Sequence, residues 1–298
     1  MEDLRQSSEW ASYMAKIGWE VADLGNTKAY IRKIPFLGSI IKIPRFNDLY
    51  LLEQIDTLAK KQKAFAAKIE PNAEIDSEKV LRALENNGYY LDNWSFAPTR
   101  TIRVDLTQSE DRILANMKKE TRYAIRKAQG LKLELGIMNN EEGLEEFINL
   151  YKQTAKRTGF WTGPIKELRL RWEIFSSAKK ADLFLASQGP ALEAGAVVFY
   201  HDKVAYYYHA ASSESGQKLN APSLLIWEII RAAKKRHCLM LDLEGIKDSR
   251  IPSTKNWEGF SRFKKGFGGQ EIELNGSFSK YYVPLIGPLF RFIQKLGI

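Results

Sequence analysis

The stretch YYYHAASSESGQKLNAPSLLIWEIIRAAKKRHCLMLDLEGI (residues 206–246) predicts a strand, a loop, a helix and a second strand in succession. Its first residues are aromatic and apolar, as expected of a buried strand. Pro222 stands near the start of the helix, where proline is tolerated. The apolar residues after Leu239 return to a strand. This order of elements is typical of an α/β fold.

Polar side chains stand at the ends of these two strands. Ligands of open α/β sheets gather at such ends. Four residues are therefore candidate substrate contacts: His209, Asn220, Asp242 and Glu244. His209 could also act as a base, and a hydrogen-bonded structural histidine explains it equally well.

Helices and strands are mixed on both sides of a boundary at Ala97-Pro98. Beyond it we expect a helical segment from Ser109 to about Gln129, a strand over 131–135, a helix over 141–158, three consecutive strands and a last strand over 270–274. A chain of 298 residues is long enough for two domains. The sequence therefore predicts two tandem α/β (α+β) units.

The net charge of +9 lies in the second part of the chain. Residues 1–98 hold 13 basic and 14 acidic side chains, whereas residues 99–298 hold 32 and 22. Such an excess favours polyanionic partners, among them nucleic acid, nucleotide-linked substrates and anionic membrane surfaces.

The composition also excludes several classes of protein. No run approaches about 18 apolar residues, so we expect no membrane-spanning helix. Met1–Glu9 is polar and does not resemble a secretory signal. Cys238 is the single cysteine and the three histidines are scattered, so we expect no disulfide and no metal site. These features predict a cytoplasmic protein.

The run MKKETRYAIRKA (residues 117–128) predicts a helix with a basic face. Two rows of side chains form this face: Lys118, Arg122 and Arg126 in one, and Lys119, Tyr123 and Lys127 in the other. Like charges at this spacing repel one another. Their accumulation therefore indicates an anion-binding surface, on which Arg and Lys hold phosphates and Tyr stacks on a base. A solvated basic face is the alternative.

The segment WEGFSRFKKGFGG (residues 257–269) interleaves aromatic and basic side chains on one helical element. Trp257, Arg262 and Lys265 are candidate contacts for the 3′ end of a tRNA, where bases stack and phosphates attract cations. The glycines that follow let the backbone turn or approach a ligand closely. An ordinary amphipathic helix explains the composition equally well.

The C-terminal residues 281–298 are rich in apolar and aromatic side chains, with a few basic ones between them. A helix packed on the body of the protein is one explanation. A peripheral contact with the inner face of the cell membrane is the other.

In combination and order, these segments resemble the FemABX family of tRNA-dependent peptidyltransferases. KKETRYAIRKA resembles the family's basic helix, HAASS with NAPSLLIWEIIRAAKK and LDLEGI its acceptor-domain core, and WEGFSRFKKGFGG its C-terminal signature. The resemblance covers nearly the whole chain and implies two GNAT-like domains without a coiled-coil arm. The first would comprise residues 1–98 plus about 276–298, and the second residues 99–275.

The resemblance implies transfer of an amino acid from aminoacyl-tRNA to the stem-peptide amine of a peptidoglycan precursor, either lipid II or UDP-MurNAc-pentapeptide. Such an enzyme serves cell wall biogenesis, uses no cofactor and forms no covalent intermediate. By motif, the family's catalytic pair falls on Phe263 and Lys264. A lysine there stabilises the oxyanion or the departing ribose hydroxyl.

Three positions depart from the family's pattern. His209 replaces a tyrosine that binds the precursor, Gly163-Pro164 replaces an Arg-Pro pair, and residues 43–46 replace a Gly-Pro turn. The acceptor therefore stays open. A non-catalytic protein that binds nucleic acid or a membrane surface is an alternative, and so is an acyl-CoA N-acyltransferase. The last is disfavoured because the pyrophosphate loop Q/R-x-x-G-x-G/A is missing.

Overall fold

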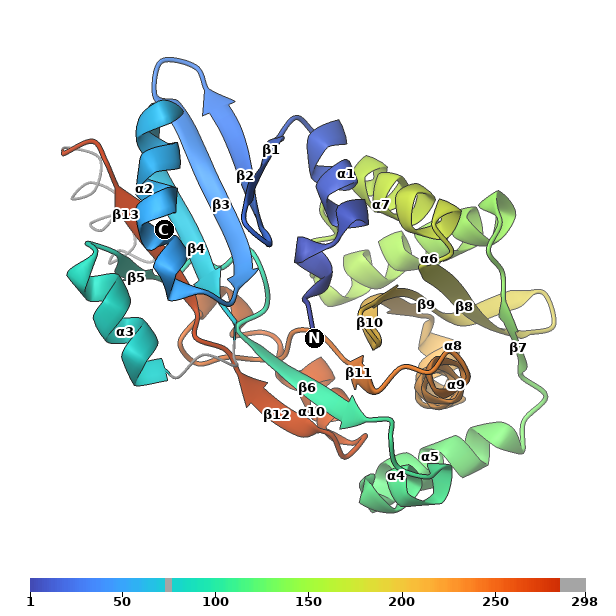
Figure 1. Ribbon diagram of the computed structural model, residues 1–298. Helices are drawn as coiled ribbons and strands as arrows, with labels where there is room; N and C mark the ends of the chain where they lie inside the picture. Colours follow the sequence, from blue (N-terminus) through green and yellow to red (C-terminus); the bar gives the residue numbers. More distant parts are fainter. Residues whose placement is uncertain (73–76, 285–298) are drawn as a thin grey trace. The chain divides into compact units, whose positions relative to one another are not determined.

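The computed structural model describes residues 1–72 and 77–284 (Figure 1). The chain forms two compact units, each built on one β-sheet. Unit 1 comprises Met1–Leu4, Ile102–Glu244 and Arg262–Glu271, and unit 2 comprises Arg5–Thr101, Gly245–Ser261 and the residues from Ile272 on. The mixed α/β class predicted from the sequence is confirmed. Residues 245–261, predicted in the domain of residues 99–275, belong to unit 2.

The six-stranded sheet of unit 2 has the order β1-β2-β3-β4-β13-β5. Its strands are β1 (Glu20–Leu24), β2 (Thr27–Ile34), β3 (Gly38–Phe46), β4 (Ala64–Pro71), β5 (Tyr90–Asp92) and β13 (Ser277–Tyr281). Strands β3 and β4 run parallel, and the other neighbours run antiparallel. Because a parallel pair needs a crossover connection, a helix, α2 (Leu52–Lys61), lies between β3 and β4 in the chain.

Two helical elements of unit 2 begin at capping residues. The Ser7 side chain accepts a hydrogen bond from the Trp10 amide at the start of α1 (Ser8–Lys16). Asp48 likewise caps η2 (Leu49–Leu51), which leads into α2. Buried side chains of α2, of α3 (Ser77–Asn86) and of the strands form one core, which includes Ile55, Leu84, Ile43, Ile69 and Phe278.

The seven-stranded sheet of unit 1 has the order β12-β6-β11-β10-β9-β8-β7. Its strands are β6 (Arg100–Asp105), β7 (Glu134–Ile137), β8 (Ala181–Gln188), β9 (Ala191–His201), β10 (Val204–Ser212), β11 (Met240–Asp242) and β12 (Gln270–Glu273). Strands β10 and β11 run parallel, joined by the crossover helix α9 (Ala221–Lys235). The strand-loop-helix-strand order predicted for residues 206–246 is therefore confirmed.

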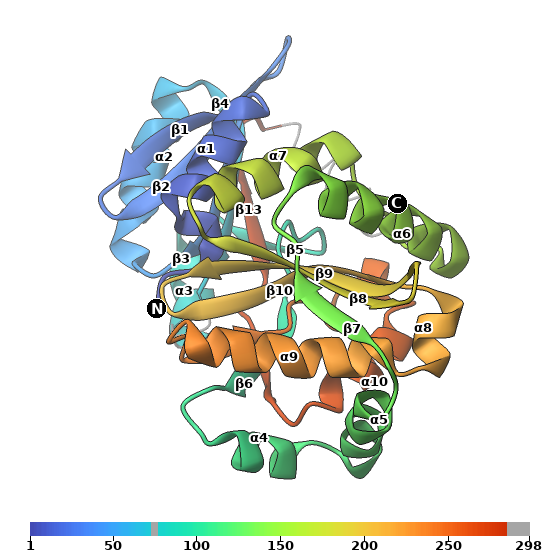
Figure 2. The same cartoon turned by 90° about the vertical axis from the view of Figure 1, so that its right-hand side faces the viewer.

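Helices cover both faces of this sheet (Figure 2). Helices α6 (Glu141–Thr158) and α7 (Ile165–Ser177) pack on one face, and α9 packs on the other. The remaining helices are η1 (Leu4–Gln6), α4 (Glu110–Asn116), α5 (Lys119–Gln129), α8 (Glu214–Lys218), η3 (Pro252–Thr254) and α10 (Glu258–Lys265). No helix within residues 1–72 and 77–284 is both long and apolar enough to cross a bilayer.

The two sheets repeat one pattern and exchange one strand. Three antiparallel strands, a helix and a parallel strand follow one another as β1-β2-β3-α2-β4 in unit 2 and as β8-β9-β10-α9-β11 in unit 1. In each sheet, the strand on the far side of that parallel strand comes from another part of the chain. Strand β13 lies there beside β4, and strand β6 lies there beside β11.

One predicted helix is divided in the structure. The helical segment expected from Ser109 to Gln129 is interrupted at Met117 and Lys118, whose backbones are extended, with ψ of 154° and 149°. Helix α5 therefore begins only at Lys119, and Lys118 is its N-cap residue. The prediction of one continuous helix is wrong at this position.

The strand predictions also contained errors. The strand expected over 131–135 lies over 134–137 as β7. Strands β5 and β13 were not predicted, and β13 includes Tyr281 of the expected tail. Tyr282 of that tail donates to Asp56 Oδ1 at 2.6 Å, and the tail's residues from 285 on lie outside the described residues.

Candidate functional site

Strand β11 ends beside the middle of β10 in unit 1. Tyr206 is opposite Asp242 in the parallel register. Strand β11 ends at this pair, whereas β10 continues to Ser212 with β9 on its other side. Within the described sheet, the last part of β10 thus has a strand neighbour on one side only. Such an opening beside strand ends is where ligands of α/β sheets bind.

Asp242 holds the turn that follows β11. Its Oδ2 accepts a hydrogen bond from Nε of Arg103 at 3.1 Å, and its Oδ1 accepts one from the Glu244 amide at 2.8 Å. Glu244 has a φ of 59°, in the left-handed region. Residues other than glycine rarely adopt this conformation. Those that do are found frequently at functional sites. Both carboxylates are buried.

Lys264 on α10 lies beside this turn. Its Nζ is 3.5 Å from the carbonyl oxygen of Glu244. Burial lowers the pKa of Lys264 to about 8, although the charges of Glu244 and Asp242 act to raise it. At neutral pH the side chain is therefore still mostly protonated, while its proton is labile near pH 8. A cation of this kind suits oxyanion stabilisation or proton transfer.

The glycines after α10 approach the protein's own backbone. At Gly268, which has a φ of 73°, an added Cβ would lie 2.1 Å from the carbonyl oxygen of Asn116. The Lys118 amide donates to the carbonyl of Gly266 at 2.9 Å. The sequence left open whether this backbone turns or approaches a ligand, and the structure shows it docked on the α4–α5 connection.

The other candidate residues of the segment 257–269 lie in different environments. Phe263 packs edge-on against Phe267, with ring centroids 5.3 Å apart. Arg262 is exposed, and Lys265 pairs with Glu271 at 2.7 Å. These residues belong to unit 1 with Lys264, whereas Trp257 belongs to unit 2, where its ring lies 5.2 Å from that of Phe260.

The predicted basic face is present with one change. Lys119, Tyr123, Arg126 and Lys127 are exposed on α5, and Lys118 is exposed just before it. The Arg122 guanidinium instead turns back to the end of α4, where it donates to the carbonyls of Ala115 and Met117. Arg122 therefore has a structural role that its helical spacing did not reveal.

His209 lies at an irregular position of β10. The register with β9 shifts between Tyr207 and His209, and such bulges re-aim side chains next to active sites. The His209 Nδ1 is 3.1 Å from the hydroxyl of Tyr151. Its Nε2 is buried and has no hydrogen-bond partner among the described residues. A buried polar atom without a partner calls for an explanation, and a substrate group is one.

Neighbouring residues keep His209 neutral. Burial first, and the charge of Arg171 second, hold its pKa well below the usual value. Burial also raises the pKa of Tyr151 to about 12, so this hydroxyl stays protonated. Arg171 donates to the Tyr208 hydroxyl at 3.3 Å, and Phe160 packs on the Tyr151 ring.

Sequence reasoning missed Tyr151, Phe160, Tyr208 and Arg171 as parts of this cluster. Their spacing gave no signal, because α6, α7 and β10 meet only in the folded sheet. Asn220, which was predicted as a contact, precedes α9 with a φ of 59°, and its side chain makes no capping hydrogen bond.

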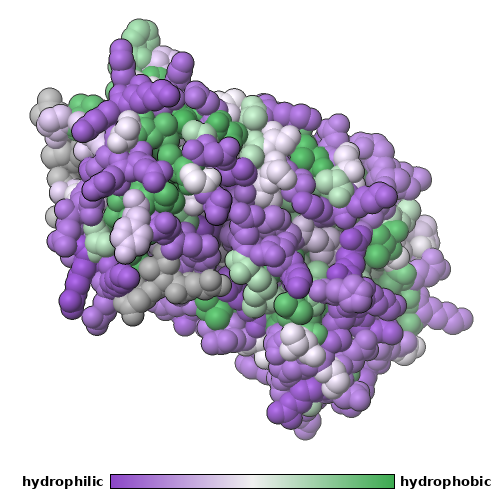
Figure 3. Space-filling view, viewed as in Figure 1, coloured by the Kyte–Doolittle hydropathy of each residue, from purple (hydrophilic) through white to green (hydrophobic). Residues whose placement is uncertain are grey.

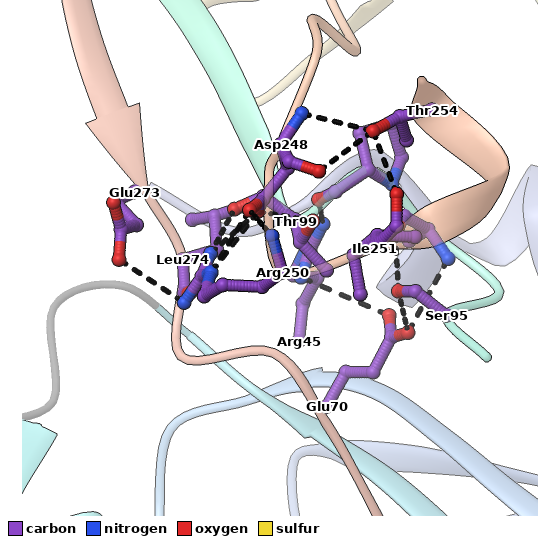
Figure 4. Close-up of polar contacts among 12 residues, drawn as sticks. Arg45, Glu70, Ser95, Thr99, Asp248, Arg250, Ile251, Thr254, Glu273 and Leu274 are labelled. Carbon is purple, nitrogen blue, oxygen red and sulfur yellow. Dashed lines mark hydrogen bonds and ion pairs between the residues drawn. The ribbon is translucent and has the colours of Figure 1, made fainter. Parts of the chain in front are cut away.

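A polar network in unit 2 secures the chain that leads to α10 (Figure 4). The Arg250 guanidinium binds Asp248 at 2.6 Å and the carbonyls of Thr99 and Leu274 at 3.2 Å each. Burial acts to raise the pKa of Asp248, but hydrogen bonds from Arg250 and Thr99 outweigh it and lower this pKa to about 2. Figure 4 shows Asp248 and Arg250 joining three segments distant in sequence.

A second network in Figure 4 surrounds Arg45, one of the residues at which the sequence departs from the family's pattern. Arg45 and Glu70 are buried together, with Nη1 and Oε2 3.7 Å apart. Glu70 also accepts hydrogen bonds from Ser95 Oγ at 2.6 Å and from the Phe96 amide at 3.0 Å. Arg45 thus lies in the interior of unit 2, paired with Glu70.

Solved structures define the class of this fold. A structure described as FemX has a TM-score of 0.82 at 19% identity, over 98% of this chain and 94% of that chain. A tandem GNAT protein from the clavulanic acid biosynthesis pathway has a TM-score of 0.52 at 11% identity, over 95% and 97% of the two chains. The expected pair of GNAT-like domains is therefore confirmed.

The family follows from the sequence comparison. The FemAB family model matches residues 49–165 and 173–295, which is most of the chain, so the chain belongs to this family. A lipid II:glycine glycyltransferase of Staphylococcus epidermidis is 27% identical over 217 residues, covering 63% of this chain and 51% of that protein. The chain thus spans about half the length of the curated relatives it matches.

Replacing Gly268 with alanine should destabilise the docking of α10. The added Cβ would meet the Asn116 carbonyl, and the positive φ would be strained, so we expect a loss of about 2–4 kcal/mol in the free energy of unfolding. Gly259, inside α10, has no atom within 4 Å of an added Cβ. Gly259→Ala should therefore match or exceed the wild type in urea denaturation. Equal midpoints for both variants would refute this docking.

Replacing Lys264 with methionine should stabilise the protein at neutral pH. A pKa of about 8 in place of the usual 10.5 means that the folded state holds this proton less tightly, at a cost on the order of 1–3 kcal/mol below pH 8. The cost disappears as the pH rises from 8 to 10.5, so the unfolding midpoints of variant and wild type should converge there. Lys265→Met, at an exposed neighbour, should give no such gain. If Lys264→Met is destabilised at pH 7, Lys264 is a structural residue.

Proposed function

We propose that this chain transfers an amino acid from an aminoacyl-tRNA to the stem-peptide amine of a peptidoglycan precursor and so builds an interpeptide bridge. Membership of the FemAB family supports this reaction class, as does the likeness to proteins named lipid II:glycine glycyltransferase. The observation that carries the proposal is the partly buried Lys264, held beside Asp242 and Glu244 at the open end of β10 and β11.

The reaction is aminolysis of an ester. The amine attacks the ester carbonyl, a C–N bond forms, and the carbonyl oxygen becomes an oxyanion. The ester C–O bond then breaks, the nitrogen loses a proton, and the ribose oxygen gains one. The Lys264 ammonium can stabilise the oxyanion or the departing ribose oxygen by its charge and its N–H groups. Asp242 and Glu244 keep enough positive charge on it for this role.

The remaining candidate residues are assigned by their chemistry. Lys118, Tyr123 and Arg126 offer cations and an aromatic ring to a nucleic-acid backbone and its bases. Trp257, Arg262 and Lys265 are assigned to the 3′ end of the tRNA, and Phe263 to the catalytic pair. His209, with its unpartnered Nε2, is assigned to the acceptor.

Lipid II is the acceptor that the named relatives favour, and UDP-MurNAc-pentapeptide is the soluble alternative. Transfer to lipid II would occur at the cytoplasmic membrane surface. Residues 281–298 were predicted to contact that surface, and this role stays a proposal.

Transfer of radiolabelled amino acids from a mixed charged-tRNA pool to lipid II and to UDP-MurNAc-pentapeptide tests the reaction. RNase-sensitive label should appear in one acceptor. Lys264→Ala should lower the rate about 10²–10³-fold, the usual effect of removing one oxyanion donor. Lys255→Ala, which removes an exposed lysine shortly before α10, is the matched control and should be active.

Absence of label in both acceptors, with folded protein that still binds tRNA, would favour the non-catalytic binding protein. Equal activity of the Lys264→Ala and Lys255→Ala variants would leave the reaction standing and remove Lys264 from it.

The pH dependence of single-turnover transfer gives an independent test. The rate should rise as the acceptor amine loses its proton and should decline above about pH 8, where Lys264 becomes neutral. Arginine stays protonated in this range, so Lys264→Arg should be slower but should lack the decline. The rates need correction for spontaneous ester hydrolysis. A decline at the same pH in both proteins would assign it to another group.

A further inference from the structure

The β2–β3 hairpin ends in an exposed apolar tip. The exposed fraction is 107% for Phe36 and 50% for Leu37, and Pro35 beside them is exposed too. Figures 1 and 2 show the turn projecting beyond the rest of the sheet of unit 2, and Figure 3 shows hydrophobic atoms at its end. This tip contributes nothing to the core.

The conformation and the exposure of the tip residues are energetically unfavourable. Phe36 has a φ of 64°, in the left-handed region that glycine and asparagine occupy more readily. The Leu37 amide donates to the Ile34 carbonyl at 3.1 Å and closes the turn in this conformation. An aromatic residue in a strained, fully exposed turn serves neither stability nor solubility, so its presence points to a binding role.

Exposed lysines lie on the segments next to the tip. Lys33 is paired with Ser39 across the hairpin. The Ser39 amide donates to the Lys63 carbonyl at 3.2 Å, and its hydroxyl donates to the Gln62 carbonyl at 2.8 Å, so the end of α2 lies beside the tip. Four lysines here are exposed: Lys33, Lys60, Lys61 and Lys63.

Acidic residues are scarce around these lysines. Residues 27–46 and 57–69 contain no aspartate or glutamate, and Asp56, one helical turn before Lys60, pairs with Lys280 at 2.6 Å. Glu20 on the adjacent β1 accepts a hydrogen bond from Gln62 at 3.2 Å. The tip is therefore apolar at its end and cationic around its base.

We propose that residues 33–37, with Lys60, Lys61 and Lys63, form a docking element for an anionic lipid bilayer. Phe36 and Leu37 would enter the boundary between head groups and acyl chains, and the lysines would meet lipid phosphates. Two apolar side chains ringed by like charges are too small for the core of a protein interface, which typically buries about 800 Å² per partner and is depleted of charge. The contact adds to the proposed function a way of reaching a lipid-linked acceptor, but it needs no acceptor.

Vesicle flotation of the full chain tests the proposal with phosphatidylglycerol–phosphatidylcholine vesicles that contain no lipid II. The wild type should float, and should do so less at high salt or without phosphatidylglycerol. Phe36→Asn with Leu37→Ser should lower the partition constant about tenfold or more, because the apolar contact is lost. Tyr50→Asn, which alters an aromatic residue of unit 2 that is 88% exposed, should have no effect.

The charges are tested in the same way. Lys60→Gln with Lys61→Gln should weaken flotation about tenfold or more. Lys79→Gln with Lys255→Gln changes the net charge of unit 2 equally, at exposed lysines outside the proposed docking element, and should weaken flotation less. If both double variants lost flotation equally, net charge alone would explain the effect, and the proposed docking element would be wrong.

Three further outcomes would overturn the proposal. They are wild-type protein that stays off all lipid vesicles, unchanged flotation of the Phe36 and Leu37 variant, and flotation that requires an added membrane protein. Transfer to soluble UDP-MurNAc-pentapeptide separates this proposal from the catalytic one. Tip variants should retain this transfer wherever the wild type shows it. A wild type that floats but labels neither UDP-MurNAc-pentapeptide nor lipid II would count against the catalytic proposal alone.

Discussion

The parallel pairing of β10 with β11 is the constraint on which the candidate site depends. Three residue pairs join these strands, and the pairing requires the crossover helix α9, which then covers one face of the sheet. Because β11 stops at Asp242, the following turn brings Glu244 to Lys264, while β10 continues through its bulge to His209. The partly buried cation follows from where β11 ends, and the unpartnered imidazole nitrogen follows from the bulge of β10.

Local signals in the sequence predicted most of the fold. Helix α6 was placed correctly because Asn140 caps its start and Gly159, with a φ of 74°, ends it. Strand β13 was missed because its partners, β4 and β5, lie about 200 residues earlier in the chain. The break at Met117 was missed because no glycine or proline marks it. It is made by the chain after α10, whose Gly266 carbonyl accepts the Lys118 amide.

The sequence predicted which residue types form the candidate site. It did not predict the burial and the hydrogen-bond partners of these residues. The resemblance pointed to Phe263 and Lys264, and their catalytic roles stay predictions. The lowered pKa of Lys264 arises from its burial in the folded chain, which no local pattern encodes. The partner of His209 is Tyr151, 58 residues away on α6. The spacing of Arg122 favoured a phosphate contact, whereas the structure shows it bound to backbone carbonyls.

The strand exchange between the sheets has a consequence for biosynthesis. Strands β1 to β5 leave the ribosome first, yet the strand that joins β4 to β5 is β13, which begins only at Ser277. Until β13 is made, β4 has an open edge, and open edges are sites of mispairing. The half of the protein that is translated first is therefore the half that is finished last. A ribosome that stops before residue 270 leaves both sheets incomplete, because β12 and β13 are then both missing.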